Sequence, residues 1–592
     1  MRFKTPATSG FQVFAVTGTN TISFAIDASA AARKKLLGFS VKRYDPEEDD
    51  SRFLRGYKVF RTLIPNPDES TDVSTFVHPV QSFVWDDFTA KPGRRYVYSF
   101  VPFRGTPKQP VRDAPISIEV DTEPLSDGVH DVFFNRGVAS SQAYAKRFHN
   151  KPPEAQPTPE KQAEARAWLT RDLLVGLLAF IDGAGPGDGL LGSFYEFRYR
   201  PVADALVKAI GRGVDVRLIV DCKVNEYTDK KGKFHPSFPR EDNLALLAES
   251  QFPMARVILR TARASSIAHN KFMVLVRGAS QQPTAVWTGS TNLSEGGLFG
   301  QTNVGHHIRV AKVAAAYRDY WTILAADPGG KKGDSASAVK KKNAELRKQV
   351  EALSPLPTAA DQIPHGVTPI FSPRGSLAAL GLYADLLDRA RHVGCMTLAF
   401  GINKAFKQQL SDNKSAKNAL TLLLLEKQDK RKKGDTGFIV LNARNNVYQA
   451  WGAYLRDPFH QWVRETSTGA LRLNTHVMYI HSKFLLQDPL GKDPIIVGGS
   501  ANFSEDSTTE SDENMVAIRG DTRAADIYFT EFNRIFQHYY FRSVHEAVKA
   551  GTDTPDATVF LAETDSWLSK YAPGTFRSKR IAAYRAMHIP GG

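Results

Sequence analysis

Cysteine is scarce in this chain of 592 residues, which contains only Cys222 and Cys395. Two thiols cannot build a disulfide framework, nor a cysteine-based zinc site on their own, so reduced cysteines in a cytoplasmic protein are the simplest expectation. Long apolar stretches are also missing, because no run reaches the roughly 18 residues of a membrane-spanning helix. The opening residues, MRFKTPATSGFQVFAVTG, lack the apolar core of a secretory signal, so we expect no signal peptide.

Acidic residues are fewer than basic ones: 62 Asp and Glu stand against 77 Lys and Arg, which gives a formal charge of +15. Such an excess favours a polyanionic partner, either nucleic acid or an acidic membrane surface, although an ordinary basic surface accounts for it equally well. The content of 42% hydrophobic and 23% charged residues is typical of globular domains.

The first part of the chain shows short alternating segments separated by Pro, Asn, Asp and Gly, among them TISFAID, GYKVFRT and RRYVYSFVPF. This pattern predicts an all-β sandwich over residues 1–124. The order of the segments resembles a fibronectin type III module. In such modules a Tyr near the start of a late strand forms a corner, and Tyr96 and Tyr98 are the candidates. The resemblance implies a binding or spacing role, with a protein or surface as partner, and no chemistry.

After residue 124 the pattern changes to alternating helices and strands, and it occurs twice. VDVRLIVD in the first half and LTLLLLE in the second are continuous apolar runs, typical of buried parallel strands. We therefore predict two similar α/β lobes, each a mixed sheet flanked by helices, at residues 125–330 and 361–545. A basic linker or solvated helix at 331–360 would join them, and a helical tail would occupy 546–592.

Two related motifs carry the candidate chemistry. IAHNKFMVLV (267–276) and YIHSKFLLQD (479–488) both read H-x-K-F and continue as an apolar strand. At similar distances follow TGSTNLSEGG and GGSANFSEDS, in which a strand enters a Gly-Ser turn suited to binding an oxyanion or phosphate. The candidate residues are His269, Lys271, Ser290 and Asn292 in the first half, and His481, Lys483, Ser500 and Asn502 in the second.

H-x-K followed by G-S-x-N, present twice, resembles the phospholipase D superfamily over about residues 130–545. The alternative is a pair of core histidines beside structural lysines, but this would leave two inward-facing lysines without a purpose. The resemblance implies a duplicated phospholipase D-like fold and a phosphohistidine intermediate, with no metal and no other cofactor. We expect His306 and His307 to be structural or solvent-facing, because adjacent strand residues point to opposite faces.

The residue types suit phosphodiester chemistry. One His can attack phosphorus, while the other protonates the leaving oxygen and then activates water. Lys271 and Lys483 would stabilise charge on the non-bridging oxygens, and Asn292 and Asn502 would act as neutral donors.

The second motif ends in Asp488, where the first has Val276. Strand alternation puts Asp488 on the face opposite His481 and Lys483, so we predict a structural residue that binds a neighbouring loop. The absence of this Asp from the first copy therefore removes no catalytic group. Phosphodiesterases acting on tyrosyl-DNA likewise lack it.

Eleven residues beyond the two Asn residues lie Asn303 and Glu513. In the superfamily's small nucleases an acid at about this offset supports the catalytic His, so we predict that Glu513 supports His481 and that Asn303 orients His269. A carboxylate favours imidazolium, whereas an amide does not. We therefore expect His481 to have the higher pKa and to act as general acid and base, and neutral His269 to be the nucleophile.

An alternative places Glu513 as an exposed acid in an acidic loop, where Glu510 and Asp512 compete with it for the supporting role.

The sequence favours nucleic acid as substrate. Basic clusters lie at 331–348 and 427–433, no membrane anchor is found, and the first half resembles the Asp-lacking branch that acts on tyrosyl-DNA. We see no amphipathic membrane helix and no exposed aromatic loop. The alternatives are a phospholipase D that hydrolyses or transfers phosphatidyl groups, and a catalytically inactive binding protein. The oligomeric state stays open.

Overall fold

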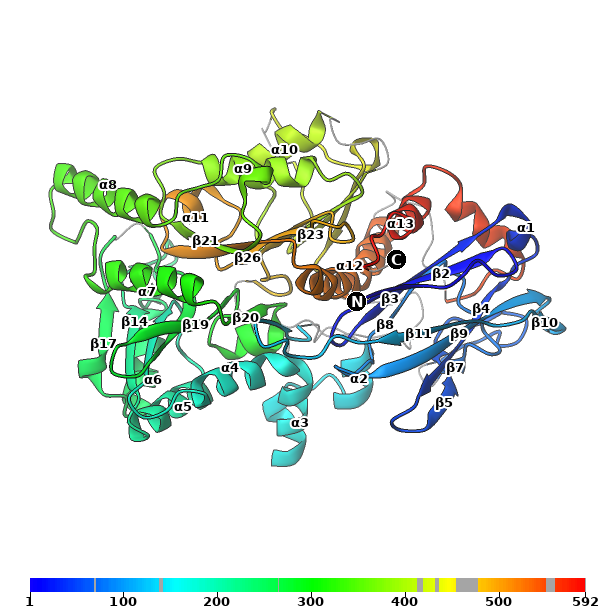
Figure 1. Cartoon of the computed structure of the whole chain (residues 1–592), viewed down its shortest axis with the longest axis horizontal. Coiled ribbons are helices and arrows are strands. Elements are labelled where there is room, and N and C mark those ends of the chain that lie inside the picture. Colours follow the sequence, from blue (N-terminus) through cyan, green and yellow to red (C-terminus); the bar gives the residue numbers. More distant parts are fainter. Residues whose placement is uncertain are drawn as a thin grey trace.

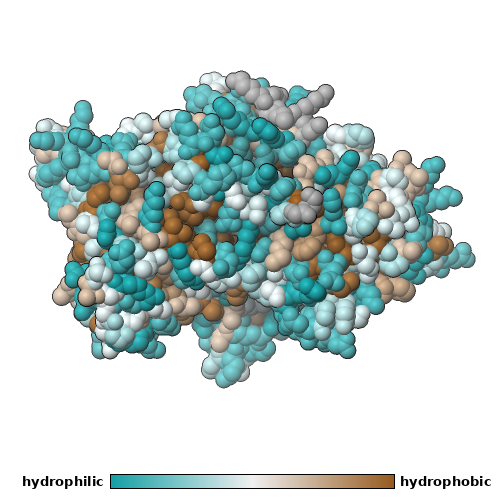
Figure 2. Space-filling view, in the orientation of Figure 1, coloured by the Kyte–Doolittle hydropathy of each residue, from teal (hydrophilic) through white to brown (hydrophobic). Residues whose placement is uncertain are grey.

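The computed structural model describes the chain except for residues 69–70, 138–141, 264–265, 413–418, 432–435, 454–476, 550–558 and 591–592. Figure 1 shows two α/β lobes stacked on each other, with the N-terminal β-sheets beside them. In the same orientation, Figure 2 shows apolar side chains in separate groups among hydrophilic ones. Of the helices in the described part of the chain, none combines the length and the hydropathy needed to cross a membrane. The predicted basic cluster at 427–433 and the predicted tail both lie partly outside the described residues.

The N-terminal part has two main antiparallel β-sheets, as predicted, and a short pair of β6 (Arg55–Gly56) with β7 (Val73–Ser74). One has the order β1 (Arg2–Lys4), β2 (Phe11–Thr17), β3 (Ile22–Ala28), β8 (Val84–Asp87). The other has the order β10 (Pro110–Arg112), β9 (Arg95–Gly105), β4 (Gly38–Asp45), β5 (Asp50–Phe53), and β11 (Ile116–Asp121) also pairs with β9. Alternate residues of β9 are buried, which turns its aromatic rings into the core.

A tyrosine corner closes this sandwich. The backbone N–H of Lys91 donates to the Tyr96 hydroxyl at 2.9 Å, whereas the Tyr98 hydroxyl donates to Asp87 at 2.8 Å. Tyr96 is thus the candidate that makes the corner contact. The fibronectin type III resemblance stays a prediction.

The two lobes repeat one sheet topology. The first sheet has the order β12 (His130–Phe134), β20 (Val304–Ile308), β19 (Gln282–Gly289), β18 (Lys271–Arg277), β13 (Gly189–Phe194), β14 (Asp215–Asp221), β17 (Val257–Arg260). The second has the order β21 (Gly366–Ser372), β27 (Glu513–Arg519), β26 (Ile495–Gly499), β25 (Phe484–Gln487), β22 (Val393–Leu398), β23 (Leu420–Leu425), β24 (Val447–Trp451). In both, the last three strands are parallel and the other pairings are antiparallel. The predicted duplication is confirmed.

Helices flank these sheets. In the first lobe they are α2 (Gln142–Phe148), α3 (Pro159–Thr170), α4 (Asp172–Asp182), α5 (Arg200–Gly211), α6 (Arg240–Glu249) and α7 (Ala311–Ala325). In the second they are α9 (Ala378–Asp388), α10 (Lys404–Ser411) and α11 (Glu505–Thr509). Both β14 and β23 are buried along almost their whole length, as expected of central parallel strands covered on both faces.

The segment between the lobes contains a packed helix, α8 (Ala336–Leu353). Ser335 caps it by accepting from the Ala338 N–H at 3.2 Å, and Leu346 and Val350 are buried while most of its lysines are exposed. Of the two interpretations of this basic stretch, a linker or a solvated helix, the structure agrees better with the helix.

The long helix α12 (Thr522–Lys549) lies where the three parts meet (Figure 1). Its buried Glu531 contacts Arg171 of the first lobe at 3.0 Å and accepts from Thr21 of the sandwich at 3.0 Å. The described part of the tail, including α13 (Phe576–Arg585), packs on the sandwich and on β23, and Trp567 donates to the Leu36 carbonyl at 2.8 Å. These contacts join the parts into one body, which the tail's sequence did not reveal.

Candidate active site

The two H-x-K motifs meet where the lobes face each other. Each His lies just before an antiparallel strand, next to the carboxyl ends of the parallel strands. Backbone bonds cross the boundary beside both motifs: Asp512 N donates to Ile267 O at 3.0 Å, and Thr302 N donates to Tyr479 O at 2.8 Å. The predicted His, Lys, Ser and Asn side chains thus lie at the boundary between the lobes, and His269, Lys271, His481 and Lys483 are all buried.

The partners of the two histidines are crossed between the lobes. Nδ1 of His269, in the first lobe, lies 2.9 Å from both carboxylate oxygens of Glu513, in the second. Nδ1 of His481 lies 2.9 Å from Oδ1 of Asn303, in the first lobe. The predicted pairing of Glu513 with His481 and of Asn303 with His269 was therefore wrong. Offsets along the chain locate a residue within its own lobe, but here Asn303, directly before β20, and Glu513, the first residue of β27, contact the opposite lobe.

The Gly-Ser turns hold these partners. Ser500 Oγ donates to Glu513 at 2.7 Å, and Ser290 Oγ donates to Asn303 Oδ1 at 2.8 Å. The preceding glycine, Gly289, is packed closely, because an added Cβ would stand 2.2 Å from the Val304 carbonyl. The two serine hydroxyl protons are thus directed at the His-supporting side chains. Their predicted contact with substrate phosphate stays a prediction.

Asn303 has a defined orientation. Its Nδ2 donates to the Gly297 carbonyl at 2.8 Å, which leaves Oδ1 to accept from Ser290 and His481. Because Nδ1 of each His donates to an oxygen, Nε2 of each ring is the nitrogen left for chemistry.

The lysines are held next to their own histidines. Lys271 Nζ donates to the His269 carbonyl at 2.7 Å, and Lys483 Nζ donates to the His481 carbonyl at 2.5 Å. Burial lowers the pKa of Lys271 to about 8. Burial, followed by the charge of Lys271, lowers the pKa of Lys483 well below its ordinary value. Two buried lysines whose charges disfavour each other are suited to an anion such as a phosphodiester, because an anion would favour their protonated forms.

Burial and the two lysines lower the pKa of both His269 and His481 well below the ordinary value. Burial raises the pKa of Glu513 to about 8. The reason for expecting a higher pKa at His481 thus fails, because the carboxylate contacts the other ring.

The two Asn residues of the motifs have different surroundings. Asn292 Nδ2 donates to Glu196 Oε1 at 2.7 Å, and the buried Oδ1 atoms of Asn292 and Asn502 accept no hydrogen bond within the described part of the chain. Glu196 lies two residues beyond β13, and the strand registers make Phe400, beyond β22, its counterpart in the second lobe. Sequence reasoning missed both residues, although each lies just past a buried strand.

A pair of buried acids was also missed. Asp221 accepts from the Ala268 N–H at 2.8 Å, directly before His269. Glu426, at the equivalent end of β23, accepts from the N–H groups of Met478, Tyr479 and Ile480, directly before His481. The sequence signal was present, because both apolar strand runs end in an acid, VDVRLIVD and LTLLLLE.

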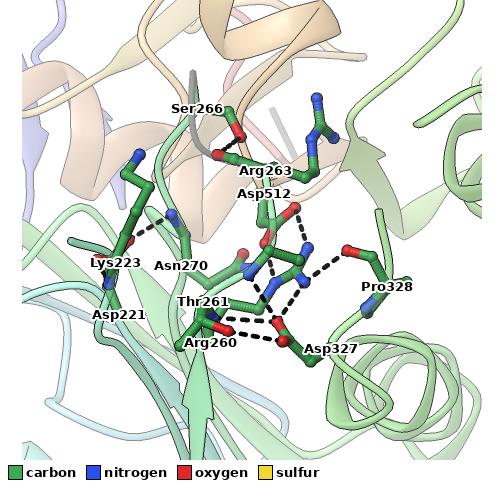
Figure 3. A network of polar contacts seen from close by, with 12 residues as sticks. Asp221, Lys223, Arg260, Thr261, Arg263, Ser266, Asn270, Asp327, Pro328 and Asp512 are labelled. Atoms are coloured by element: carbon green, nitrogen blue, oxygen red, sulfur yellow. Dashed lines mark hydrogen bonds and ion pairs between the residues drawn. The ribbon is translucent and has the colours of Figure 1, made fainter. Parts of the chain in front are cut away.

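The competing acids near Glu513 have other partners. Figure 3 shows buried Arg260 between Asp327 and Asp512, at 2.8 and 2.9 Å. Glu510 contacts Arg263 at 3.0 Å and Arg347 at 2.5 Å. These ion pairs anchor the loop that precedes Glu513 to the first lobe and to α8, and they leave Glu513 as the acid at the histidine.

The predicted structural role of Asp488 fits its contacts. Its carboxylate accepts hydrogen bonds from the backbone N–H groups of Arg391, His392 and Val393 at 2.8, 2.7 and 3.1 Å.

His306 lies in a buried network between His130 (2.8 Å) and the Tyr528 hydroxyl (2.6 Å). Within the described ranges, no three His, Cys, Asp or Glu side chains are grouped so as to hold a metal ion.

Comparison with known proteins places the first lobe in a class. Residues 177–322, about a quarter of the chain, match the family described as "Cardiolipin synthase, PLD-like domain". This segment is a phospholipase D-like domain, and the second lobe repeats its sheet topology. The family match thus covers the first lobe and its half of the site, and the second lobe resembles it in sheet topology and in its motif.

Solved structures show only distant likeness, and no curated protein matches. Phosphatidylserine synthase from Haemophilus influenzae Rd KW20 is 12% identical, with a TM-score of 0.41, covering 71% of this chain and 94% of that one. Yeast tyrosyl-DNA phosphodiesterase is 12% identical, with a TM-score of 0.28, covering 58% and 87%. Polyphosphate kinase from Porphyromonas gingivalis is 12% identical, with a TM-score of 0.34, covering 59% of this chain but only 45% of the kinase.

Proposed function

We propose that the protein is a phosphodiesterase that works through a phosphohistidine on His269, without a metal or other cofactor. The observation that carries the proposal is the pairing of two buried histidines in one site with chemically different partners, a carboxylate for His269 and an amide for His481. Two lysines beside them supply positive charge for the phosphoryl oxygens.

In the first step Nε2 of His269 attacks phosphorus, the N–P bond forms and the bond to the leaving oxygen breaks. A proton on Nε2 of His481 passes to that oxygen. Phosphorylation gives the His269 ring a positive charge, and the negative charge of the Glu513 carboxylate stabilises it. The proposed nucleophile is therefore His269, as predicted from the sequence. The reason differs, because the sequence argument expected an amide beside this histidine and its partner is the carboxylate of Glu513.

In the second step water attacks phosphorus, gives its proton to His481 and releases His269. Asn303 orients the His481 ring without stabilising its charged form, so the imidazolium stays a strong acid. An anionic substrate beside His481 favours the protonated ring that the first step needs.

Nucleic acid is the substrate we favour. The chain carries a charge of +15, which suits a polymer with many phosphates better than a single lipid phosphate. Phosphatidyl hydrolysis or transfer is the second candidate, supported by the family description of the first lobe. The intact His, Lys, Ser and Asn of both motifs argue against an inactive binding protein. A cytoplasmic location, and a binding or spacing role for the N-terminal sandwich, remain our expectations.

The test is a parallel assay with EDTA present, using bis(p-nitrophenyl) phosphate, plasmid DNA, single-stranded DNA, RNA, and phosphatidylcholine or cardiolipin vesicles. His269→Ala should abolish turnover, and His365→Ala, which changes an exposed histidine, should not. The covalent intermediate is then trapped with substrate and mapped. Phosphate on His481 would contradict the assignment, and cleavage of lipid alone would overturn the substrate.

A further inference from the structure

Two connections that follow equivalent strands lie at the site. Strands β14 and β23 occupy the same place in the two sheets, and each ends next to an acid that binds the segment before a catalytic His. The chain then continues through residues 222–239 in the first lobe and, among the described residues, through 427–431 in the second. The duplication therefore places one connection on each side of the site.

The connection in the first lobe contains a small hairpin of β15 (Tyr227–Thr228) and β16 (Phe234–His235). It exposes two aromatic side chains, Tyr227 at 59% and Phe234 at 61%. The Tyr227 ring stacks on His235 with centroids 4.7 Å apart. Three exposed lysines, Lys230, Lys231 and Lys233, occupy the turn.

The base of this hairpin reaches the catalytic centre. Phe238 contacts Tyr195 with ring centroids 6.3 Å apart, and Tyr195 contacts His269 at 5.0 Å. The connection that carries the hairpin is therefore linked to His269 through two ring contacts.

The second lobe presents a similar surface. Phe400 is 59% exposed and takes the place that Glu196 has beside Asn292 in the first lobe. Lys427 and Lys430 are exposed, and the nearby acid Asp429 is paired with Lys407 at 2.9 Å. Exposed rings and lysines thus occur on both sides, contrary to our expectation of no exposed aromatic loop.

We infer that residues 222–239 on one side of the scissile phosphate, and Phe400 with residues 427–431 on the other, bind a single-stranded nucleic acid, with phosphates at the lysines and bases stacked on Tyr227, Phe234 and Phe400. The inference rests on the proposed function and names its substrate class. Exposed rings interleaved with basic side chains are how proteins bind single strands without sequence preference. The catalytic His and Lys are at most 6% exposed, so they suit a thin flexible chain better than a rigid duplex.

Binding is measured by anisotropy in the His269→Ala background, with a labelled oligothymidylate of about 20 nucleotides, longer than common site sizes. Tyr227→Ser with Phe234→Ser, and separately Phe400→Ser, should each weaken binding about tenfold or more. Changing Lys230, Lys231 and Lys233 to Ser should lower the slope of log affinity against log salt by about 2.

Matched controls lie away from the two connections. Phe88→Ser alters an exposed ring of the sandwich, and Lys340→Ser with Lys341→Ser alters exposed lysines of α8; neither should change affinity. The variants of Tyr227, Phe234 and the three hairpin lysines, made with His269 intact, should hydrolyse bis(p-nitrophenyl) phosphate at rates within twofold of wild type, and circular dichroism checks the fold of Phe400→Ser. This shows that they fold and keep the site.

Unchanged oligonucleotide affinity in the ring and lysine variants would overturn the inference. A second result would also overturn it. If wild type bound phosphatidylglycerol vesicles but no single strand, and the ring and lysine variants lost the vesicle binding, the surface would serve a membrane. Failure of the proposed function gives a different result: wild type would leave every diester uncleaved, while anisotropy still reports whether the strand binds.

Discussion

The contact between Glu513 and His269 gives the sharpest test of the mechanism. Glu513→Gln keeps the shape and can still accept from His269 Nδ1. A positive ring favours the carboxylate form of Glu513 over the protonated form that its raised pKa of about 8 otherwise allows, so the change replaces a charge-assisted hydrogen bond with a neutral one. Bonds of the first kind contribute about 1.5–3 kcal/mol and of the second about 0.5–1.5 kcal/mol. The charge that forms on His269 should therefore lose about 1–2 kcal/mol of stabilisation, which slows formation of the phosphoenzyme about 5- to 30-fold.

Single-turnover kinetics with rapid acid quench measures this step directly. Glu513→Ala should be slower still, because it also removes the group that fixes the ring tautomer. Glu510→Gln is the matched control: it changes an acid in the same loop that contacts Arg263 and Arg347 instead of the histidine, and it should leave the rate nearly unchanged. The reasoning is refuted if Glu513→Gln forms phosphoenzyme within twofold of the wild-type rate.

Three further predictions concern the support of the site. Asp488→Ala should lower the free energy of unfolding in urea by about 2 kcal/mol, because three N–H groups lose their acceptor, while turnover of a small diester persists; a large loss of turnover would contradict its structural role. Glu426→Ala should reduce kcat about 100-fold by displacing the segment before His481, and Glu426→Gln, whose amide oxygen still accepts, should retain most activity; equal loss in both variants would contradict positioning. Lys271 is protonated below its pKa of about 8 and neutral above it, so KM for an anionic diester should rise as the pH passes 8; Lys271→Arg should remove that rise, and a rise that persists would assign it to another group.

The crossed partners make catalysis depend on how the lobes dock. Each histidine is oriented by the other lobe, so neither half of the duplication contains a complete site. Arg260 and Asp512 connect the lobes through a buried ion pair beside Glu513. Removing one partner of such a pair leaves an uncompensated buried charge, which destabilises a protein by about 3–5 kcal/mol.

The sequence by itself determined what is local or periodic. Alternation along the strands identified the sandwich and placed Asp488 off the catalytic face, because side-chain direction in a strand follows from position alone. The repeated motifs determined the duplication and the main site residues, since a short segment fixes both the residue types and their spacing. The apolar runs before Asp221 and Glu426 already marked equivalent strands.

Only the tertiary structure decided which partner each histidine has. The offset from Asn502 to Glu513 is a distance along one lobe, whereas the hydrogen bond joins two lobes whose relative placement depends on many packing contacts. The same holds for the tail, which packs on the sandwich through Trp567, and for Phe400 and the hairpin of Tyr227, whose exposure depends on everything folded around them. Chemistry could thus be predicted from residue types, but the partners that distinguish His269 from His481 could be assigned only once the lobes were placed against each other.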